Sequence, residues 1–304
     1  MIRCGIDLGG SKIAIICLDK HHQTLYEDRI ATPQGNYSAT LSSIKKLVMG
    51  AEKHLGCSVP VGIGTPGAIS QLTGKIKNSN STCLNGKPLK EDLEDCLQRS
   101  IKLANDANCF ALSEATDGAA QNQSVVFGVI VGTGTGAGIS INQQILTGKN
   151  GIAGEWGHNP LPWKDSNYLQ KKPCYCGKSG CIETFLSGPG LESEYFNTTG
   201  KNLKSPQIVT QAEKGEHQAE VILTSYEENM AKALAHVINI LDPDCIVLGG
   251  GMSNIHRLYK NVPQKWGNYV FSDSVSTELL PPRFGDASGV RGAARLWSLE
   301  ELNP

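Results

Sequence analysis

The chain has 304 residues, 39% hydrophobic and 19% charged, and a formal net charge of −1. This balance provides no basic field that would attract nucleic acid or an anionic membrane surface, and no apolar run is long enough to span a bilayer. Because the first residues show no charged segment followed by an apolar stretch, we expect a cytoplasmic protein with reduced thiols, and its length favours two domains.

The first half of the chain predicts alternating strands and helices. Residues 2–18 form two apolar runs around Gly9-Gly10, a pattern typical of a β-hairpin. Apolar spacing then predicts, in chain order, a strand at 24–32, a helix at 38–55, a strand at 59–64, a helix at 89–99, a strand at 101–104 and a helix ending at Ala115.

The second half repeats the opening pattern. An apolar strand at 125–131 precedes a glycine-rich turn at 132–138 and a return strand at 139–141. A long helix at 219–241, a strand at 245–248 and a closing helix at 289–297 follow. The recurrence predicts a duplicated core, and the alternation of strands and helices predicts an α/β fold.

Three glycine clusters each follow an apolar strand, at Gly9-Gly10, at 132–138 and at 249–251. Glycine lets the backbone approach an anion closely, and Ser11 and Lys12 add a hydroxyl and a cation. One such turn would indicate only a tight hairpin, but three favour a nucleotide polyphosphate. Asp7 within the first strand is costly to bury alone, so it either holds Mg²⁺ through water or is hydrogen-bonded.

Asp106 lies at the end of a short strand, immediately before a helix. Ligands of α/β proteins bind at such strand ends, where a carboxylate could accept a proton from a sugar hydroxyl that attacks a phosphate. The alternative is that Asp106 only caps the helix. The phosphate-type turns, together with Glu155 and Glu183, favour the catalytic interpretation.

A cluster of histidine and cysteine residues predicts a metal site. Its members are His158, Cys174, Cys176 and Cys181. Thiolate and imidazole are preferred Zn²⁺ ligands, and four protein ligands make a closed, structural site. Such a site would also fix the positions of Glu155 and Glu183, which flank the cluster in the sequence. Disulfides or buried free thiols are the alternatives, and free thiols are expected for the seven scattered cysteines: Cys4, Cys17, Cys57, Cys83, Cys96, Cys109 and Cys245.

Together these motifs resemble the ROK family (repressors, open reading frames, kinases) of sugar kinases. The resemblance rests on the segments 5–12, 105–108, 132–136, 154–158, 174–183 and 248–251. It implies a two-lobed actin-like ATPase fold of the ribonuclease H-like, hexokinase type. It also implies a small lobe at 1–117, a large lobe with the zinc loop at 118–288, and a C-terminal helix at 289–304 that packs back on the small lobe.

The resemblance also implies a role for each matching residue. Asp106 would be the catalytic base, and the sugar would be held by Asn105, Asp106, Glu155, His158, Glu183, Gly67 and Asn80. ATP and its Mg²⁺ would meet Asp7, Gly9, Gly10, Ser11, Lys12, Gly132, Thr133, Gly134, Thr135, Gly136 and Gly250. Structural Zn²⁺ would bind His158, Cys174, Cys176 and Cys181. A homodimer is a further expectation.

Two segments bear on the substrate. Residues 157–163 and 77–82 look most like bacterial fructokinase/mannokinase, which predicts phosphorylation of the 6-hydroxyl of fructose, and also of mannose or glucose. N-acetylglucosamine kinase is the alternative. A sugar-responsive ROK repressor is less favoured, because a helix-turn-helix segment precedes the core in such proteins, whereas here the first predicted strand starts at residue 2.

Overall fold

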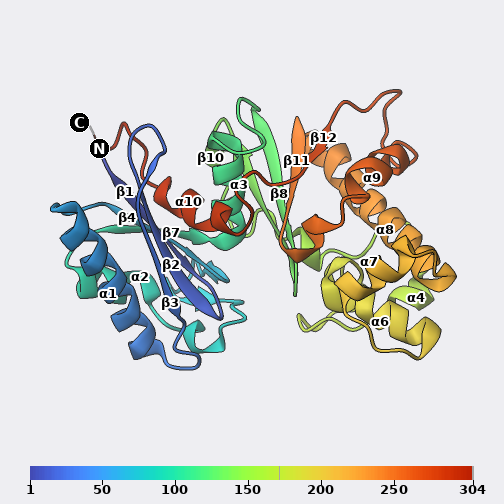
Figure 1. The fold of residues 1–304 in the computed structure, drawn as a ribbon, viewed down its shortest axis with the longest axis horizontal. Helices are drawn as coiled ribbons and strands as arrows, with labels where there is room; N and C mark the ends of the chain where they lie inside the picture. The colour runs from blue at the N-terminus through green and yellow to red at the C-terminus, as the bar shows by residue number, and fades with distance from the viewer. Residues whose placement is uncertain (171, 303–304) are drawn as a thin grey trace. The chain divides into compact units, whose positions relative to one another are not determined.

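A computed structural model describes residues 1–170 and 172–302, which form two compact units (Figure 1). Unit 1 contains residues 1–121, residues 138–153 and the chain from Asp286 onward, and unit 2 contains residues 122–137 and 154–285. Residues 138–153 therefore pack with unit 1 in this division, although the lobe boundaries inferred from the sequence include them in the large lobe.

Unit 1 is built on a five-stranded sheet. In spatial order its strands are β3 (Thr24–Ala31), β2 (Lys12–Leu18), β1 (Arg3–Leu8), β4 (Val61–Thr65) and β7 (Ile101–Asn105). β1, β4 and β7 run parallel, whereas β2 pairs antiparallel with β1 and with β3. Every residue of β4 is buried, as expected for a central parallel strand covered on both faces.

The predicted N-terminal hairpin is confirmed. β1 and β2 pair from Arg3↔Leu18 to Leu8↔Ile13, and the Gly9 N–H donates to the Lys12 carbonyl at 3.0 Å. The expectation of free thiols is wrong for one pair, because Cys4 and Cys17 form a disulfide with their Cα atoms 4.1 Å apart. The hairpin register places these two residues directly opposite each other, although 13 positions separate them in the sequence.

The helices of unit 1 include the three predicted in the first half of the chain. They are α1 (Tyr37–Leu55), α2 (Leu89–Leu97), α3 (Asp106–Thr116) and α10 (Ser288–Ala294), with the 3₁₀ turn η1 (Thr82–Leu84) and the small strand pair β5 (Ala68–Ile69) and β6 (Ile76–Lys77). The Asn36 side chain caps α1 by accepting from the Ala39 N–H, and Gly56 ends it in the left-handed conformation. A further 3₁₀ turn, η4 (Gly285–Ala287), precedes α10.

Helix α10 packs directly on backbone atoms of β1, β4 and α3. A Cβ at Gly5 would lie 2.1 Å from the Val290 carbonyl oxygen, and one at Gly292 would lie 1.7 Å from the Cys109 carbonyl oxygen. These glycines therefore serve close packing rather than a turn. The same approach brings Gly289 next to the Asp7 carboxylate.

The second sheet repeats the strand order of the first. Its strands are β10 (Gln144–Ile145), β9 (Thr135–Ile141), β8 (Val125–Val131), β11 (Cys245–Gly249) and β12 (Glu278–Leu280). β8, β11 and β12 are parallel, as β1, β4 and β7 are. The predicted duplicated α/β core is thereby confirmed. The boundary between the units falls within β9.

The glycine-rich turn of the second hairpin is shorter than predicted. We expected a turn over 132–138, but the Gly132 N–H bonds the Gly134 carbonyl at 2.9 Å and β9 begins at Thr135. Gly138 lies within β9, and a Cβ at this position would come within 2.3 Å of the Ala107 carbonyl oxygen, so only glycine fits there. Close packing, and not chain reversal, explains this glycine.

Unit 2 carries most of the helices. They are α4 (Ser166–Gln170), α5 (Glu183–Leu186), α6 (Gly188–Thr199), α7 (Ser205–Glu213), α8 (His217–Leu241) and α9 (Leu258–Trp266), with the 3₁₀ turns η2 (Trp156–His158) and η3 (Gly251–Asn254). The predicted long helix is α8, which starts two residues before the predicted position at 219 because Glu216 caps it. α8 packs against α6, α7 and α9.

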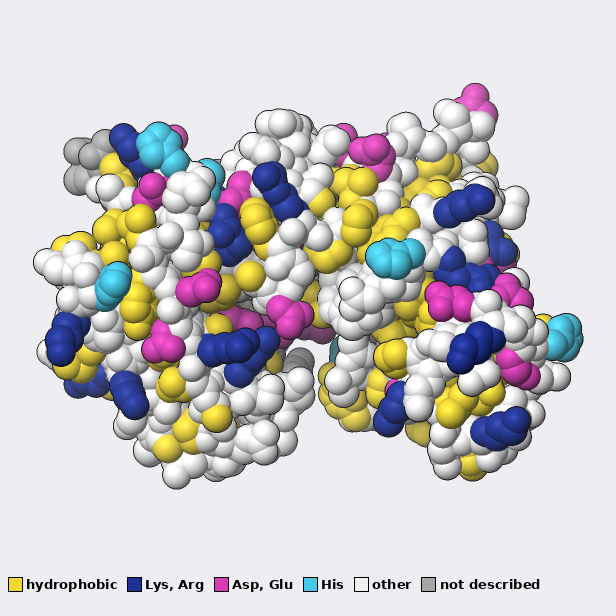
Figure 2. Space-filling model, viewed as in Figure 1, with side chains coloured by type: hydrophobic (Ala, Val, Ile, Leu, Met, Phe, Trp, Pro, Cys, Tyr) yellow, Lys and Arg dark blue, Asp and Glu magenta, His cyan; other side chains and the backbone are white. Residues whose placement is uncertain are grey.

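No helix in the described part of the chain is both long and apolar enough to cross a membrane. On the face drawn in Figure 2, basic and acidic side chains are interspersed on each unit. This mixture agrees with the near-zero net charge of the sequence.

Candidate active site

The parallel strands of unit 1 end at one edge of their sheet. Asp7 pairs in register with Gly64, and Thr65 pairs with Asn105. Ligands of open α/β sheets bind at the carboxyl ends of such strands. The first sheet therefore gathers Asp7, the segment 65–67 and Asn105-Asp106 at this edge.

Asn105 and Asp106 divide two tasks at the start of α3. The Asn105 side chain is the helix cap, because its Oδ1 accepts from the Ala107 N–H at 2.9 Å, while its Nδ2 donates to the Gly67 carbonyl at 2.9 Å. Asp106 is the first residue of the helix, and its Oδ1 also accepts from Ala107 at 2.8 Å. The capping position is thus taken by Asn105, so capping does not explain why an aspartate follows it.

Gly67 and Asn80 belong to neighbouring loops. Gly67 has φ +82°, and a Cβ on it would lie 2.5 Å from the Lys77 carbonyl oxygen and 2.9 Å from the Ser79 nitrogen. Only glycine allows this approach without strain. Ser79 and Asn85 exchange two hydrogen bonds of 2.9 Å, which hold the loop that carries the exposed Asn80.

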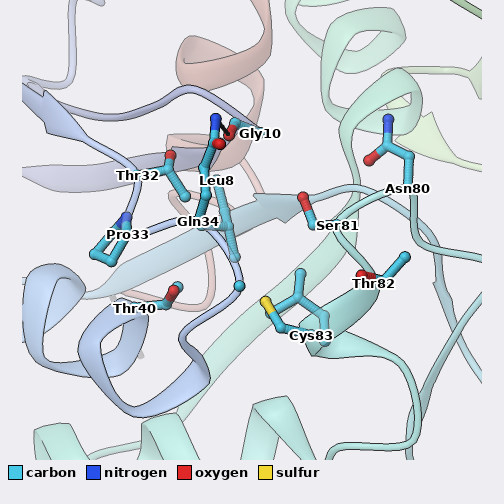
Figure 3. Close-up of a pocket in the computed structure, with 12 residues that line it drawn as sticks. Leu8, Gly10, Thr32, Pro33, Gln34, Thr40, Asn80, Ser81, Thr82 and Cys83 are labelled. Atoms are coloured by element: carbon cyan, nitrogen blue, oxygen red, sulfur yellow. Dashed lines mark hydrogen bonds between the residues drawn. The ribbon is translucent and has the colours of Figure 1, made fainter.

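A cavity of about 390 Å³ joins Asn80 to the first glycine turn (Figure 3). Gly10 and Thr32 contribute from one side, and Asn80 and Ser81 from the other. The Thr32 hydroxyl donates to the Gly9 carbonyl at 2.7 Å, which holds the turn against the wall of the cavity. Hydroxyl, amide and apolar groups line it, with no charged side chain among its described lining residues. This lining suits a neutral polar ligand.

Asp7 faces a second cavity of unit 1, of about 450 Å³, with Lys12 and Asp286. Burial, together with the nearby carboxylates Asp106 and Asp286, raises the pKa of Asp7 to about 6, while Lys12 opposes the shift. Lys12 Nζ lies 3.4 Å from Asp286 Oδ2. A partly buried carboxylate with acidic neighbours fits Mg²⁺, because a hard cation would relieve their repulsion.

The raised pKa of Asp7 predicts a pH dependence. Below about pH 6 the carboxyl is protonated and a poor Mg²⁺ ligand, so kcat/KM for Mg-nucleotide should fall about tenfold per pH unit. In the unfolded chain the pKa of Asp7 is about 4, about two units lower than in the folded protein. The folded state is therefore destabilised by the ionised carboxylate: this cost is absent below about pH 4, grows between about pH 4 and 6, and is complete above about pH 6. Asp7→Asn should therefore unfold at higher urea than wild type at about pH 8. A flat kcat/KM profile from about pH 5 to 8 would contradict the assignment.

In unit 2, Glu183 lies against the second glycine turn. Its Oε2 accepts from the Thr135 N–H at 2.9 Å, and a Cβ on Gly134 would lie 2.7 Å from the same oxygen. Gly157 of η2 packs on the Thr135 carbonyl oxygen, at 1.9 Å from an ideal Cβ. The turn, Glu183 and η2 are therefore one packed group. Glu155, which precedes η2, is exposed.

Gly250 stands at the end of β11, beside the end of β8. It has φ +76°, and a Cβ would lie 2.4 Å from the Val131 carbonyl oxygen. The pairing Gly249↔Ile130 places the third glycine cluster next to Gly132. The described part of unit 2 thus brings the two predicted nucleotide-type clusters to one sheet edge.

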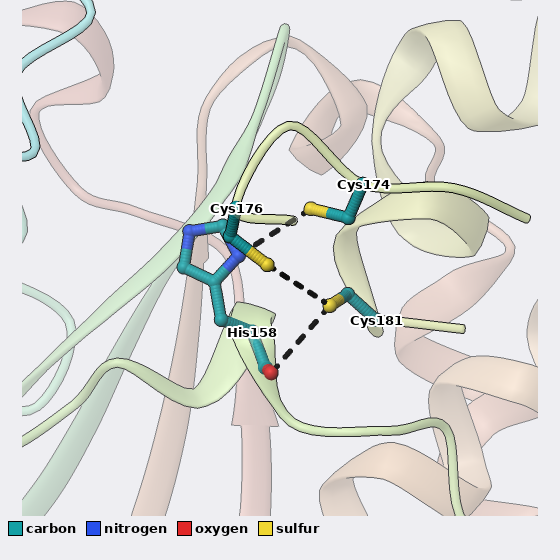
Figure 4. A group of neighbouring side chains, drawn as sticks. All are labelled: His158, Cys174, Cys176 and Cys181. Atoms are coloured by element: carbon teal, nitrogen blue, oxygen red, sulfur yellow. Dashed lines mark hydrogen bonds between the residues drawn. The ribbon is translucent and has the colours of Figure 1, made fainter. Parts of the chain in front are cut away.

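The predicted metal ligands come together (Figure 4). Their ligand atoms all lie within 4.8 Å of one another; Cys176 Sγ and Cys181 Sγ are 3.6 Å apart, and Cys174 Sγ is 3.6 Å from His158 Nδ1. Ligands of tetrahedral Zn²⁺ lie about 3.5–3.8 Å apart at Zn–S bonds of about 2.3 Å. His158, Cys174, Cys176 and Cys181 thus fit a closed, structural zinc site, which would support the loop and leave no open position for chemistry.

Tyr175 is a neighbour of this cluster that the sequence-based prediction missed. Its hydroxyl lies 3.1 Å from His158 Nε2, and the two rings meet edge to face at 5.2 Å. The residue as a whole is 77% exposed, but desolvation of its hydroxyl raises the pKa of Tyr175 to about 12, helped by the negative charge of Glu183. Its place between two cysteine ligands was the one available signal in the sequence.

Tyr175 and Glu183 also line a cavity of about 540 Å³ in unit 2, together with Thr133 of the glycine turn. One wall is an ionic group in which the Tyr168 hydroxyl and Lys172 Nζ both bond Glu194 at 2.8 Å. No pattern in the sequence indicated this group, because its members are spread over residues 168–194.

The predicted site residues therefore form two groups, one in each unit. Unit 1 holds Asp7, Gly9, Gly10, Ser11, Lys12, Gly67, Asn80, Asn105 and Asp106. Unit 2 holds Gly132 to Gly136, Glu155, His158, Cys174, Cys176, Cys181, Glu183 and Gly250.

Known proteins resemble the chain along nearly its whole length. "N-acetyl-D-glucosamine kinase" of Escherichia coli O127:H6 is 38% identical over 296 residues, covering 96% of this chain and 98% of that protein. The ROK hexokinase structure from Thermus thermophilus matches with a TM-score of 0.87 at 27% identity, covering 100% of both chains. A ROK family glucokinase from Streptomyces griseus, in complex with glucose and AMPPNP, matches with a TM-score of 0.78 at 25% identity, covering 97% of this chain and 99% of that one.

These similarities bear on two predictions from the sequence. The hexokinase-type two-lobed fold is confirmed by the solved structures. The preference for fructose is not confirmed, since the curated relative reported above is named an N-acetyl-D-glucosamine kinase. The family model described as "ROK family" matches residues 3–300. The chain therefore belongs to the ROK family.

Proposed function

We propose that this protein is an ATP-dependent sugar kinase that phosphorylates the 6-hydroxyl of free N-acetylglucosamine. The reaction class is supported by Asn105-Asp106 at the strand edge that also carries Asp7 and the first glycine turn. The sugar is supported by 38% identity over 96% of the chain to an N-acetylglucosamine kinase. Fructose, mannose or glucose is the second candidate, favoured by residues 157–163 and 77–82 and by the hexokinase and glucokinase structures.

Asp106 is the proposed general base. The sugar O6 forms a bond to the γ-phosphorus as the bond from that phosphorus to the bridging oxygen of ADP breaks, and the hydroxyl proton passes to the Asp106 carboxylate. The Asn105 side chain caps α3 and donates to the Gly67 carbonyl, which fixes the start of the helix that carries the base, and the second hydrogen of its Nδ2 is left for a sugar hydroxyl. A base held on a helix N-terminus keeps its position during the reaction.

The glycine turns are the proposed phosphate contacts. Backbone N–H groups of Gly9 to Lys12 and of Gly132 to Gly136 can approach the phosphates closely because the turns carry few side chains. Mg²⁺ would neutralise charge on the phosphates, and Asp7 is the residue that would hold it through water. Lys12 would exchange its exposed contact with Asp286 for a phosphate oxygen.

The remaining assignments concern the sugar and the assembly. Gly67, Asn80 and Asn105 of unit 1 and Glu155, His158 and Glu183 of unit 2 are proposed to hold sugar hydroxyls, and Zn²⁺ is proposed to support the loop of His158. A cytoplasmic homodimer stays a prediction from the sequence and its family resemblance.

One assay series tests the function. ADP release should be measured with ATP and Mg²⁺ for N-acetylglucosamine, fructose, mannose and glucose, and the product should carry its phosphate on O6 by ³¹P and ¹³C NMR. We expect the highest kcat/KM for N-acetylglucosamine. A higher value for fructose, mannose or glucose would establish the second candidate, and ADP release independent of every sugar would overturn the kinase assignment.

A further inference from the structure

The indole of Trp156 bonds the segment that carries Glu155 to the long helix α8. Trp156 is the first residue of η2 and follows Glu155 directly, and its side chain is 5% exposed. Its Nε1–H donates to the Ala233 carbonyl of α8 at 3.2 Å. Its ring meets Phe127 of β8 edge to face, with 5.9 Å between the ring centroids. The buried side chain of Trp156 therefore lies between β8 and α8 and contacts both.

The bond from Trp156 is additional to the hydrogen bonds that α8 makes within itself. Ala233 lies in the interior of the helix, where each carbonyl accepts from the N–H four residues later. A carbonyl oxygen has two lone pairs, so it can accept from the indole as well. The helix keeps its own bond when the indole is removed, so the bond from Trp156 fixes the position of η2 and not that of α8.

Helix α8 also holds the segment that carries Glu183. The buried Tyr226 hydroxyl of α8 donates at 2.7 Å to the carbonyl of Leu186, the last residue of α5, and α5 begins at Glu183. Tyr226 and Ala233 are about two turns apart on the same helix. The segments of both proposed sugar carboxylates, Glu155 and Glu183, are thus bonded to one rigid element of unit 2.

A second contact of α8 with the chain beyond η2 lies at the surface. Lys232 Nζ donates to the Trp163 carbonyl at 3.4 Å, in an exposed bond that lies farther along the chain from Glu155. On the other side of η2, Gly157 packs on the Thr135 carbonyl oxygen, and Thr135 is held in β9. Trp156 therefore makes the buried side-chain bond that lies next to Glu155.

We propose that Trp156 is a positioning residue that holds Glu155 in place for the sugar through α8. This proposal rests on the proposed function, because it takes Glu155 as a sugar ligand. Without the indole bond η2 can take other positions, and the apparent sugar affinity falls with the fraction of molecules in which Glu155 is placed for binding. The glycine turns stand between their own strands, so nucleotide binding should not depend on Trp156.

The test compares Trp156→Phe with wild type and with Trp266→Phe. Phenylalanine keeps an aromatic ring but removes the N–H. Trp266 is the matched control, because it is a buried tryptophan, 2% exposed, on a different helix of the same unit. By calorimetry, we expect Trp156→Phe to weaken binding of N-acetylglucosamine about tenfold and of AMPPNP less than about twofold, with zinc per chain unchanged. Trp266→Phe should lower Tm comparably and leave both affinities within about twofold of wild type.

A measurement on the wild-type protein does not depend on how well Trp156→Phe folds. The chain has four tryptophans, so the Trp156 indole N–H resonance can be assigned by elimination from the spectra of Trp163→Phe, Trp266→Phe and Trp297→Phe. Saturating N-acetylglucosamine should slow hydrogen exchange of this N–H at least about tenfold, because the sugar favours molecules in which the bond is closed. AMPPNP alone should leave the exchange rate unchanged.

Several outcomes would overturn the proposal. Unchanged sugar affinity in Trp156→Phe, or unchanged indole exchange on addition of sugar, would show that the bond does not support the sugar site. Equal weakening of sugar and nucleotide binding, or the same sugar loss in Trp266→Phe, would show a general loss of packing, and loss of zinc would assign the effect to the metal cluster. If wild type prefers another hexose, the proposed sugar fails, and that hexose replaces N-acetylglucosamine in the same comparison. A wild type that binds none of the four sugars would overturn both proposals.

Discussion

Asp106→Asn should lower kcat by about 10²–10⁴-fold, because general-base catalysis supplies rate enhancements of this size. Asparagine keeps an oxygen that can accept from the Ala107 N–H, and Asn105 still caps α3, so the fold and the start of the helix should persist. KM for the sugar and for ATP should change only a few-fold. Steady-state kinetics, with thermal unfolding as the check on folding, measure both effects.

The matched control is Asp95→Asn, which removes the same charge from an exposed position of α2 in unit 1. It should retain wild-type kcat. A loss of less than about tenfold in Asp106→Asn would contradict the base assignment. A comparable loss in both variants would show an effect of net charge and not of proton transfer.

The core hairpins were predictable because their signals are local. Apolar runs on either side of Gly9-Gly10 specify a strand, a turn and a strand over fewer than 20 residues. The same holds for the long helix α8, which places apolar residues on a buried face over 25 residues. The helices α4 to α7 were not predicted; each has at most 12 residues, so only a few turns carry the periodic signal.

Features that depend on contacts between distant segments were not predictable. Cys4 and Cys17 meet through hairpin register, and Gly5 and Gly292 are required by the packing of α10 on β1 and α3. The start of β9 at Thr135 was misplaced for the same reason, because Gly138 marks close packing and not a turn. The sequence alone does not reveal whether a glycine serves close packing or a turn.

The candidate site shows the same division. The proposed catalytic and ligand residues stand in motifs of fixed spacing, so the sequence alone was enough to propose them. Tyr175 was not predicted, because it contacts His158, which lies 17 residues earlier in the sequence. The ionic group of Tyr168, Lys172 and Glu194 was equally hidden, because its members adjoin only after the loop folds onto α6.

Removing zinc should weaken sugar binding at least about tenfold and leave nucleotide binding within about twofold. The reason lies in the chain around Cys181. This cysteine is followed by Ile182 and Glu183, and the Ile182 N–H bonds the Asn159 carbonyl at 2.8 Å, next to His158. A metal that joins Cys181 to His158 therefore holds Glu183 and His158 in fixed positions. The second glycine turn bonds Glu183 as well, but it is held on both sides by β8 and β9, and Gly250 follows β11, so these backbones keep their places when the zinc loop loosens.

Cys181→Ser and exhaustive chelation are two independent ways to make this change. Zinc content should be measured by mass spectrometry, and the affinities for N-acetylglucosamine and AMPPNP by calorimetry. Cys57→Ser is the matched control, since Cys57 is an exposed free cysteine in unit 1. Unchanged sugar affinity in zinc-free protein would contradict a supporting role for the metal. Equal loss of sugar and nucleotide affinity would show that zinc stabilises the whole of unit 2 and not the loop of His158 alone.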